Sequence, residues 1–165
     1  ETLGLKPKSK VAELGCTIGE ALLAVHVSYG PLIQGLLKKF NPVSKPSAAG
    51  AIKALAHITG GGFGDNIPRV LPAKCDAVVL KGSWEMPPIF KIIREKGGVD
   101  EAELYQVFNM GIGMTVVVDA DCADAVLRAI KAAKHPITLA KRCQQCVSVN
   151  NAPPVQPLEL AMLHF

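Results

Sequence analysis

Apolar residues spaced three and four positions apart predict helices in several parts of the chain. The clearest case is residues 31–40, where five apolar side chains share one face and a proline suits the first turn. The same spacing predicts helices over 48–57 and over 87–97, the latter opened by two prolines and closed by two glycines. Further helices are expected after Asp100 and after Asp121, because aspartate is a good N-cap.

Short apolar runs predict strands at 77–80 and at 114–118, the second of which is rich in β-branched residues. Helices that alternate with strands favour an α/β or α+β fold, a mixed sheet with helices packed on it. After residue 135 the pattern fades and prolines gather. We therefore expect one domain over 1–135 and a divergent, irregular tail over 136–165.

The composition agrees with a single folded domain. The chain has 165 residues, of which 49% are apolar and 19% charged, enough to bury a core. Its net charge of +4 is spread along the chain without a nucleic-acid-binding motif, so we expect no nucleic-acid partner. The longest stretch without acidic or basic side chains, residues 21–37, is too short and too interrupted to span a membrane. No signal peptide opens the chain, and we expect a cytoplasmic protein with no membrane partner. A first residue of Glu1 rather than Met predicts a trimmed chain or a piece of a longer one.

The cysteines do not predict a disulfide framework. The chain has five of them, an odd number without regular spacing. Cys143 and Cys146 form a C-x-x-C pair, but a zinc site needs two further ligands at suitable spacing, and a redox pair needs a strand-to-helix turn. We expect reduced thiols and predict no metal site, although the role of this pair stays open.

The most unusual segment is a glycine-rich loop after His57. Three consecutive glycines are unfavourable unless the backbone turns tightly or approaches another group closely. Their N–H groups can form a nest for an anion, and a helix capped by Asp65 or Asn66 would add its positive end. His57 stands beside the loop and can transfer protons near neutral pH. The candidate phosphate-binding residues are Thr59, Gly60, Gly61, Gly62, Asn66 and Arg69. The alternative is a plain glycine-rich connector with a surface arginine and a packed histidine.

Two other segments carry candidate residues. Residues 108–114 contain Asn109 followed by Gly111 and Gly113. The G-x-G spacing of the two glycines resembles that of a nucleotide-binding loop. The dinucleotide fingerprint follows a strand, however, whereas these glycines precede one, so we expect them to let the backbone pass under a packed neighbour. His26 and Ser28 place polar side chains in an apolar stretch and are candidates for a supporting role.

Several of these motifs together resemble the C-terminal half of the phosphoribosylformylglycinamidine cyclo-ligase (aminoimidazole ribonucleotide synthetase) family. The resemblance covers about residues 1–135. The resembling segments are Gly19-Glu-Ala-Leu-Leu23, His57-Ile-Thr-Gly-Gly-Gly62, Asn66-Ile-Pro-Arg-Val-Leu-Pro72, Gly82-Ser-Trp84 and Phe108-Asn-Met-Gly-Ile-Gly-Met114.

The resemblance implies ATP-dependent ring closure in de novo purine biosynthesis, which converts formylglycinamidine ribonucleotide to aminoimidazole ribonucleotide. It implies a phosphorylated ribonucleotide as substrate, with ATP and magnesium held mainly by an N-terminal domain. It also implies a homodimer. His57 would then be the catalytic candidate at the cleft between the domains, and the chain alone would be inactive. The chain departs from the family pattern at Val27, where members usually carry an arginine, and at Gly30, where they carry an aliphatic residue.

Two alternatives remain open on sequence grounds. The chain could serve as a non-catalytic interaction or dimerisation fragment. It could also belong to a sister ATP-dependent family, such as selenophosphate synthetase or thiamine-monophosphate kinase. The segments around Asn66 and Asn109 favour the cyclo-ligase.

Overall fold

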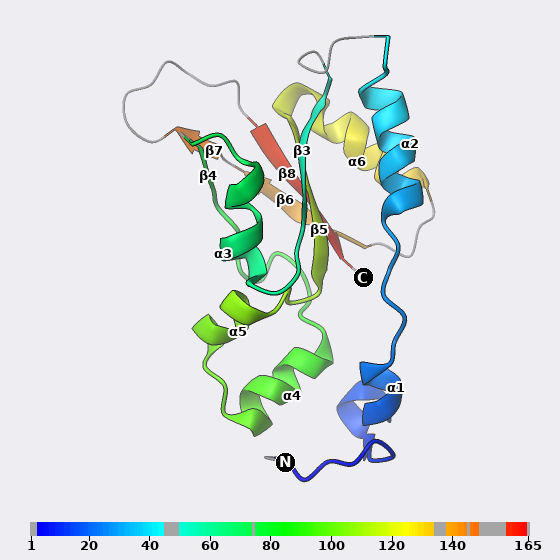
Figure 1. Ribbon diagram of the computed structural model, residues 1–165, viewed down its shortest axis with the longest axis vertical. Coiled ribbons are helices and arrows are strands. Elements are labelled where there is room, and N and C mark those ends of the chain that lie inside the picture. The colour runs from blue at the N-terminus through cyan, green and yellow to red at the C-terminus, as the bar shows by residue number, and fades with distance from the viewer. Residues whose placement is uncertain are drawn as a thin grey trace.

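The core of the molecule is a four-stranded sheet. The computed structural model describes residues 3–44, 50–73, 75–133, 138–144, 146–148 and 158–164, and for 138–144, 146–148, 158–160 and 164 the backbone alone is described. The strands follow the order β3-β5-β8-β6, and every described pair is antiparallel (Figure 1). Their bounds are β3 Ile52–His57, β5 Ile112–Asp119, β6 Thr138–Gln144 and β8 Leu158–His164. The α+β class is confirmed, and the described sheet is antiparallel rather than mixed.

The central strand β5 supplies side chains to both faces of the sheet. Val116 and Val118 pack into one hydrophobic cluster, whereas Val117 packs into the other, as the two-residue period of a strand requires. All three are almost completely buried. Because β5 buries side chains on both faces of the sheet, both faces must be covered, which favours a helix–sheet–helix arrangement.

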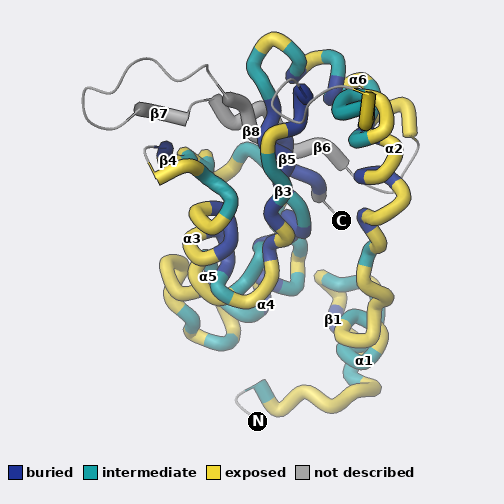
Figure 2. Tube along the Cα trace, turned by 45° about the horizontal axis from the view of Figure 1, so that its top comes forward, coloured by how far each residue is buried: buried dark blue, intermediate teal, exposed yellow. Residues whose placement is uncertain are grey.

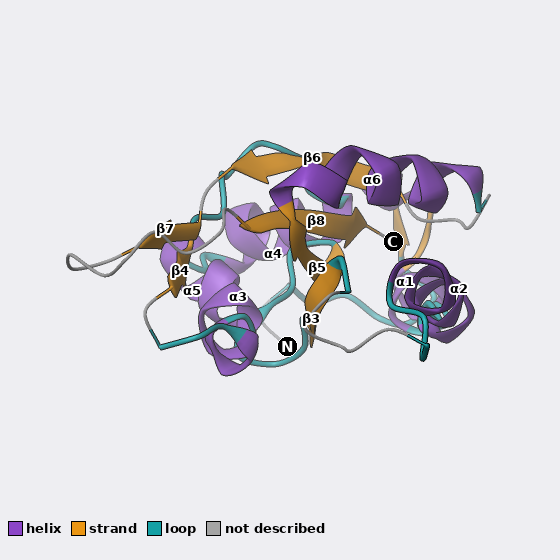
Figure 3. Cartoon of the chain, turned by 90° about the horizontal axis from the view of Figure 1, so that it is seen from above, coloured by secondary structure: helices purple, strands orange, loops and turns teal. Residues whose placement is uncertain are grey.

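Helices cover the two faces separately. One face carries α2 Gly30–Phe40 and α6 Ala123–Ala132, and the other carries α3 Gly62–Asn66, α4 Pro88–Gly97 and α5 Glu101–Val107. Seen from above, α2 and α3 lie on opposite sides of the strands (Figure 3). Short 3-10 turns, η3 Pro68–Val70 and η4 Ala120–Cys122, follow α3 and β5. A separate short pair joins β4 Cys75–Ala77 to β7 Cys146–Ser148. No helix among the described residues is long and apolar enough to cross a membrane.

An N-terminal arm, residues 3–28, precedes the sheet and is largely exposed (Figure 2). It contains β1 Lys10–Val11, η1 Ala12–Leu14, β2 Cys16–Thr17 and α1 Ile18–Leu22. Thr17 and Glu20 form a capping box at the start of α1, which lowers the pKa of Glu20 through the backbone N–H of Thr17. The arm contacts α4 through an ion pair between Glu13 and Lys96, with nitrogen and oxygen 2.7 Å apart.

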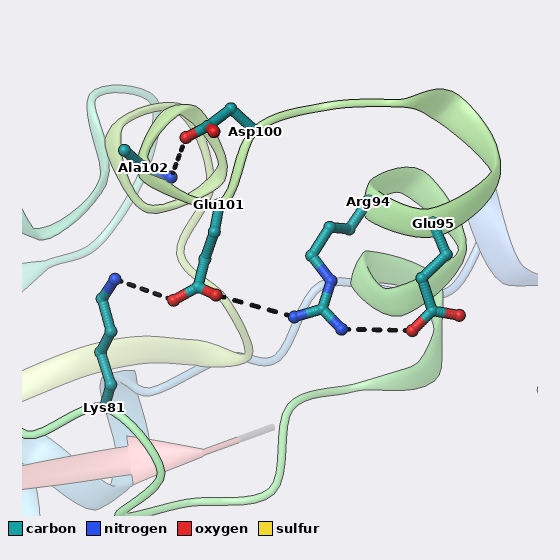
Figure 4. Close-up of polar contacts among 6 residues, drawn as sticks. All are labelled: Lys81, Arg94, Glu95, Asp100, Glu101 and Ala102. Carbon is teal, nitrogen blue, oxygen red and sulfur yellow. Dashed lines mark hydrogen bonds and ion pairs between the residues drawn. The ribbon is translucent and has the colours of Figure 1, made fainter.

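A charged network fastens the loop after β4 to the helices beside it (Figure 4). The ammonium group of Lys81 donates to Glu101 over 2.8 Å, and Arg94 lies 3.7 Å from the other oxygen of that carboxylate. The hydrogen bond from Lys81 is the main reason that the pKa of Glu101 is lowered. Asp100 caps α5 by accepting from the backbone N–H of Ala102, as predicted.

The helix predicted over 48–57 is wrong, because residues Ile52–His57 form strand β3. A β-bulge between Ile52 and Ala54 explains the misleading spacing. The bulge brings Ile52 and Leu55, three residues apart, to the same face of the sheet and so imitates a helical period. The side chain of Asn41 pairs with both backbone groups of Ile52 and completes the edge there.

The irregular tail predicted over 136–165 is also corrected in part. Strand β8 lies inside the sheet between β5 and β6, and Met162 and Leu163 are completely buried. The sequence after Asn150 contains three prolines before β8. Because proline is unfavourable inside a sheet, this composition predicts no strand there. The division of the chain at residue 135 stays a prediction.

Three smaller predictions shift. The strand expected at 77–80 is β4, which ends at Ala77. The cap expected at Asp121 does not form, because α6 begins after the 3-10 turn η4 and has no side-chain cap. The helices predicted over 31–40 and 87–97 and the strand over 114–118 are confirmed.

Candidate functional site

The glycine-rich loop connects the end of β3 to α3. Gly61 and Gly62 both adopt the left-handed backbone conformation, with φ of 91° and 57°. Gly62 is buried, and a Cβ placed on it would collide with the carbonyl oxygen of Tyr105 at the end of α5. Glycine is therefore required at these two positions by conformation and, at Gly62, by the close approach of two backbones.

Asn66 braces the loop from inside. Its side-chain amide donates to the carbonyl oxygens of Gly62 over 2.7 Å and of Gly60 over 3.3 Å. Its side-chain oxygen lies 3.5 Å from the Thr59 hydroxyl, and the residue is only 6% exposed. The expectation that Asp65 or Asn66 caps a helix is wrong, because α3 begins earlier, at Gly62, and the amide of Asn66 instead holds the loop carbonyls.

The outer side of the loop remains available to a ligand. Thr59 and Gly60 are exposed, and the N–H groups of Gly60 and Gly61 donate no hydrogen bond to any described residue. The carboxylate of Asp65 stands against Gly61, where an added Cβ would lie 2.5 Å from its Oδ2 atom. An anion is therefore favoured on the Thr59 and Gly60 side and disfavoured near Asp65.

His57 ends β3 directly before the loop and faces His26 of the N-terminal arm. Their Nε2 atoms lie 3.3 Å apart, and both side chains are exposed. Tyr29 contacts both rings edge to face, with ring centroids 6.0 Å from His57 and 6.4 Å from His26. The structure thus brings together the two histidines that lie 31 positions apart in the sequence.

Tyr29 lies beside the two histidines, although it is not among the candidate residues of the sequence analysis. Only 5% of its surface is exposed, and its hydroxyl has no hydrogen-bond partner among the described residues. Burial raises the pKa of the hydroxyl. The ring covers Gly113, where a Cβ would collide with the hydroxyl oxygen. Gly113 therefore admits a packed neighbour, as predicted.

The second glycine loop supports the first one. The N–H of Ile58 donates to the carbonyl oxygen of Gly113 over 2.9 Å, so the two loops adjoin. Asn109 accepts from the N–H of Gly111 over 3.0 Å and closes a turn. Trp84 donates to the carbonyl oxygen of Met110 over 2.8 Å, which makes it an anchor of this turn.

Two predicted site residues are not joined to this group. Arg69 lies exposed in η3 and forms no ion pair with any described residue. Ser28 is exposed between His26 and Tyr29, and no hydrogen bond connects it to the part of the chain that is described. Both remain candidates by position.

The described residues contain one feature near the loop that the sequence did not reveal. A mainly apolar pocket of about 390 Å³ lies between α3, η3 and the segment that begins with β4. Its wall includes Phe63, Ile67, Leu71, Cys75, Ala77 and Val79.

No three His, Cys, Asp or Glu side chains gather as a metal site within the described residues. Cys16, Cys75 and Cys122 are free thiols, and the side chains of Cys143 and Cys146 lie outside the described residues.

These features define an α+β domain that presents a braced, glycine-rich loop and a histidine at the end of an edge strand. The chain belongs to the family described as AIR synthase related protein, C-terminal domain, whose model matches residues 36–138.

The chain is also similar to curated cyclo-ligases. It is 42% identical over 127 residues to the phosphoribosylformylglycinamidine cyclo-ligase of Syntrophotalea carbinolica, which is 77% of this chain and 33% of that protein. It is 43% identical over 122 residues to the cyclo-ligase of Acetivibrio thermocellus, which is 74% of this chain and 33% of the relative. It is 42% identical over 115 residues to the chloroplastic cyclo-ligase of Arabidopsis thaliana, which is 70% of this chain and 27% of that relative. The chain spans about a third of the length of the curated relatives that it matches.

Proposed function

We propose that this chain is the C-terminal, substrate-binding part of an ATP-dependent phosphoribosylformylglycinamidine cyclo-ligase. The observation that carries the proposal is the family match over residues 36–138, which contains the glycine-rich loop. In this function the complete enzyme closes the imidazole ring of aminoimidazole ribonucleotide from formylglycinamidine ribonucleotide. The reaction serves de novo purine biosynthesis in the cytoplasm.

The loop after β3 is the proposed contact for the phosphorylated ribonucleotide. The unpaired N–H groups of Gly60 and Gly61 and the exposed hydroxyl of Thr59 supply neutral donors for phosphate oxygens. Asn66 contributes indirectly, because it holds the loop carbonyls on the inner side. Arg69 is the proposed cationic contact once substrate is bound.

His57 is the proposed catalytic or substrate-contacting group. Its side chain is exposed at the end of β3, so a ligand on the loop can reach the imidazole. Imidazole can accept and release a proton near neutral pH, as cyclisation by an attacking nitrogen requires. His26, Ser28, Asn109, Gly111 and Gly113 are proposed to support these residues from the adjoining segments.

ATP and magnesium are proposed to bind mainly to an N-terminal domain of the same enzyme, which is the proposed partner of this chain. The complete enzyme is proposed to be a homodimer. The described residues offer no cluster of three carboxylate, thiol or imidazole groups, so we assign no magnesium ligands to them. ATP would supply the phosphoryl group that activates the formyl oxygen. The chain alone is therefore expected to show no ATP-dependent cyclisation, and measurable turnover by the purified chain would contradict this.

Titration calorimetry with formylglycinamidine ribonucleotide tests the loop. Gly60→Pro removes the backbone N–H donor of this residue, whereas Gly60→Ala keeps it. The alanine variant is a suitable control because a Cβ at position 60 meets no atom within 4 Å. We expect the proline variant to bind at least about fivefold more weakly than the alanine variant, because it loses one charge-assisted hydrogen bond to the phosphate. Circular dichroism checks that both variants are folded. Equal affinities would refute the anion nest.

Two charge changes test the surroundings of the loop. Asp65→Asn removes the carboxylate beside Gly61 and is expected to tighten binding about threefold, because a nearby negative charge repels phosphate. Arg69→Ala should weaken binding more than Lys91→Ala, which removes an equal charge from the exposed surface of α4. If the Arg69 and Lys91 variants bind alike, Arg69 is not part of the site.

A further inference from the structure

The contact between His26 and His57 has a geometry with a use beyond the proposed support of His57 in ring closure. The ring centroids are 5.4 Å apart, whereas the two Nε2 atoms are only 3.3 Å apart. The Nε2 atoms therefore lie on the facing edges of the two rings. Since a ring nitrogen carries its lone pair in the ring plane, the two Nε2 positions converge on the space between the rings.

The separation of these nitrogens matches two ligands of one metal ion. Zinc binds imidazole nitrogen at about 2.0–2.1 Å, and two such ligands at a tetrahedral angle are about 3.3 Å apart. Without a metal ion the same distance allows an N–H···N hydrogen bond, in which one ring donates and the other accepts. The two Nε2 atoms therefore already have the separation that an ion between the rings requires.

The two rings lie side by side without a metal, next to the buried ring of Tyr29. His57 is fixed at the end of β3 by its pairing with Met114 of β5. His26 precedes α2 and is held by the buried ring of Tyr29, which contacts both imidazoles. The two ligands come from separate elements, so an ion bound between them would connect the N-terminal arm to the end of β3.

The exposure of the pair determines which ions it suits. Both side chains are open to solvent, so two coordination positions remain for water or for an oxygen of a bound ligand. Imidazole suits zinc, copper and nickel, whereas magnesium and calcium prefer oxygen ligands. We propose that His26 and His57 form a two-histidine site for a divalent transition-metal ion, which links the N-terminal arm to the end of β3. This site goes beyond the proposed ring-closing function and does not depend on it.

Calorimetric titration of the full chain with Zn²⁺ alone tests the proposal. His26→Gln and His57→Gln each keep a hydrogen-bonding amide near the same place but remove the imidazole ligand. We expect each variant to weaken Zn²⁺ binding at least about tenfold, because the second ligand acts at high effective concentration. A tenfold excess of Mg²⁺ is not expected to compete.

Controls separate this pair from the other ligands of the chain. His135→Ala with His164→Ala removes the remaining two of the four histidines, and Cys143→Ser with Cys146→Ser removes the C-x-x-C pair. Both double variants are expected to retain the site with unchanged affinity. The proposal is overturned if the unaltered chain binds Zn²⁺ no better than His26→Gln, or if either double variant abolishes the same site. Circular dichroism verifies the fold of each variant.

Discussion

Replacing Gly62 by alanine is the sharpest probe of how the glycine-rich loop is built. Gly62 has φ of 57° and is buried between the loop and the end of α5. An alanine Cβ would collide with the carbonyl oxygen of Tyr105 and would lie 3.1 Å from that of Phe108. Both neighbours are backbone atoms of an element packed in the core, so they cannot move aside as a flexible side chain could.

The expected loss of stability has two parts. Placing a non-glycine residue in the left-handed conformation is unfavourable by about 1–2 kcal/mol. Overpacking against fixed neighbours adds about 1–3 kcal/mol. We therefore expect Gly62→Ala to lower the free energy of unfolding by about 2–5 kcal/mol, a large part of the 5–15 kcal/mol typical of a domain.

Urea denaturation followed by circular dichroism measures this loss, with Gly60→Ala and Gly64→Ala as matched controls. Both control positions lie within five residues of the same loop, have no positive φ, and offer open space to a Cβ. Gly60→Ala should change the free energy of unfolding by less than about 1 kcal/mol, and Gly64→Ala, inside α3, should raise it by about 0.5–1 kcal/mol. If Gly62→Ala unfolds at the same urea concentration as Gly60→Ala, the close packing of the loop on α5 is refuted.

Three further variants test other parts of the structure. Tyr29→Phe removes a buried hydroxyl without a partner and should stabilise the chain by about 1 kcal/mol in urea denaturation, and a loss of stability would show that the hydroxyl is paired in solution. Asn66→Ala removes the amide that holds the loop carbonyls and should destabilise by about 1–3 kcal/mol in the same assay, so an unchanged midpoint would contradict the brace. Glu101 has a lowered pKa because Lys81 stabilises its charged form, so its contribution to stability is present above the unfolded-state pKa and disappears as the pH falls through the folded-state pKa. Thermal melts from pH 6 to pH 3 should therefore show a weaker acid dependence for Glu101→Gln than for Glu103→Gln, and identical profiles would contradict the ion pair.

The fold could be predicted from sequence where several local signals agree with one another. The helices over 31–40 and 87–97 were found because their apolar faces and terminal prolines and glycines agree with each other. Strand β3 was missed because its bulge imitates helical spacing. Strand β8 was missed because pairing with β5 and β6, which no local pattern records, overrides its proline-rich surroundings.

The candidate site shows the same division. The glycines of the loop could be recognised because few residues tolerate positive φ, and Gly61 and Gly62 do adopt it. The role of Asn66 as an internal brace depends on a three-dimensional contact with carbonyl groups that the sequence does not encode locally. The approach of His26 to His57 depends on the path of the N-terminal arm, so sequence reasoning could name both histidines but could not pair them.

The central claim is that this chain forms the substrate-binding part of a ring-closing ligase. The most direct measurement joins the full chain to the N-terminal part of the Syntrophotalea carbinolica cyclo-ligase, in place of the relative's matching segment. ATP-dependent formation of aminoimidazole ribonucleotide from formylglycinamidine ribonucleotide is then assayed. We expect turnover by the fusion, and a fall of at least about 100-fold in kcat/KM for its His57→Gln variant, which is the range for loss of a proton-transfer group. A folded fusion that binds both substrates but forms no product would contradict the claim.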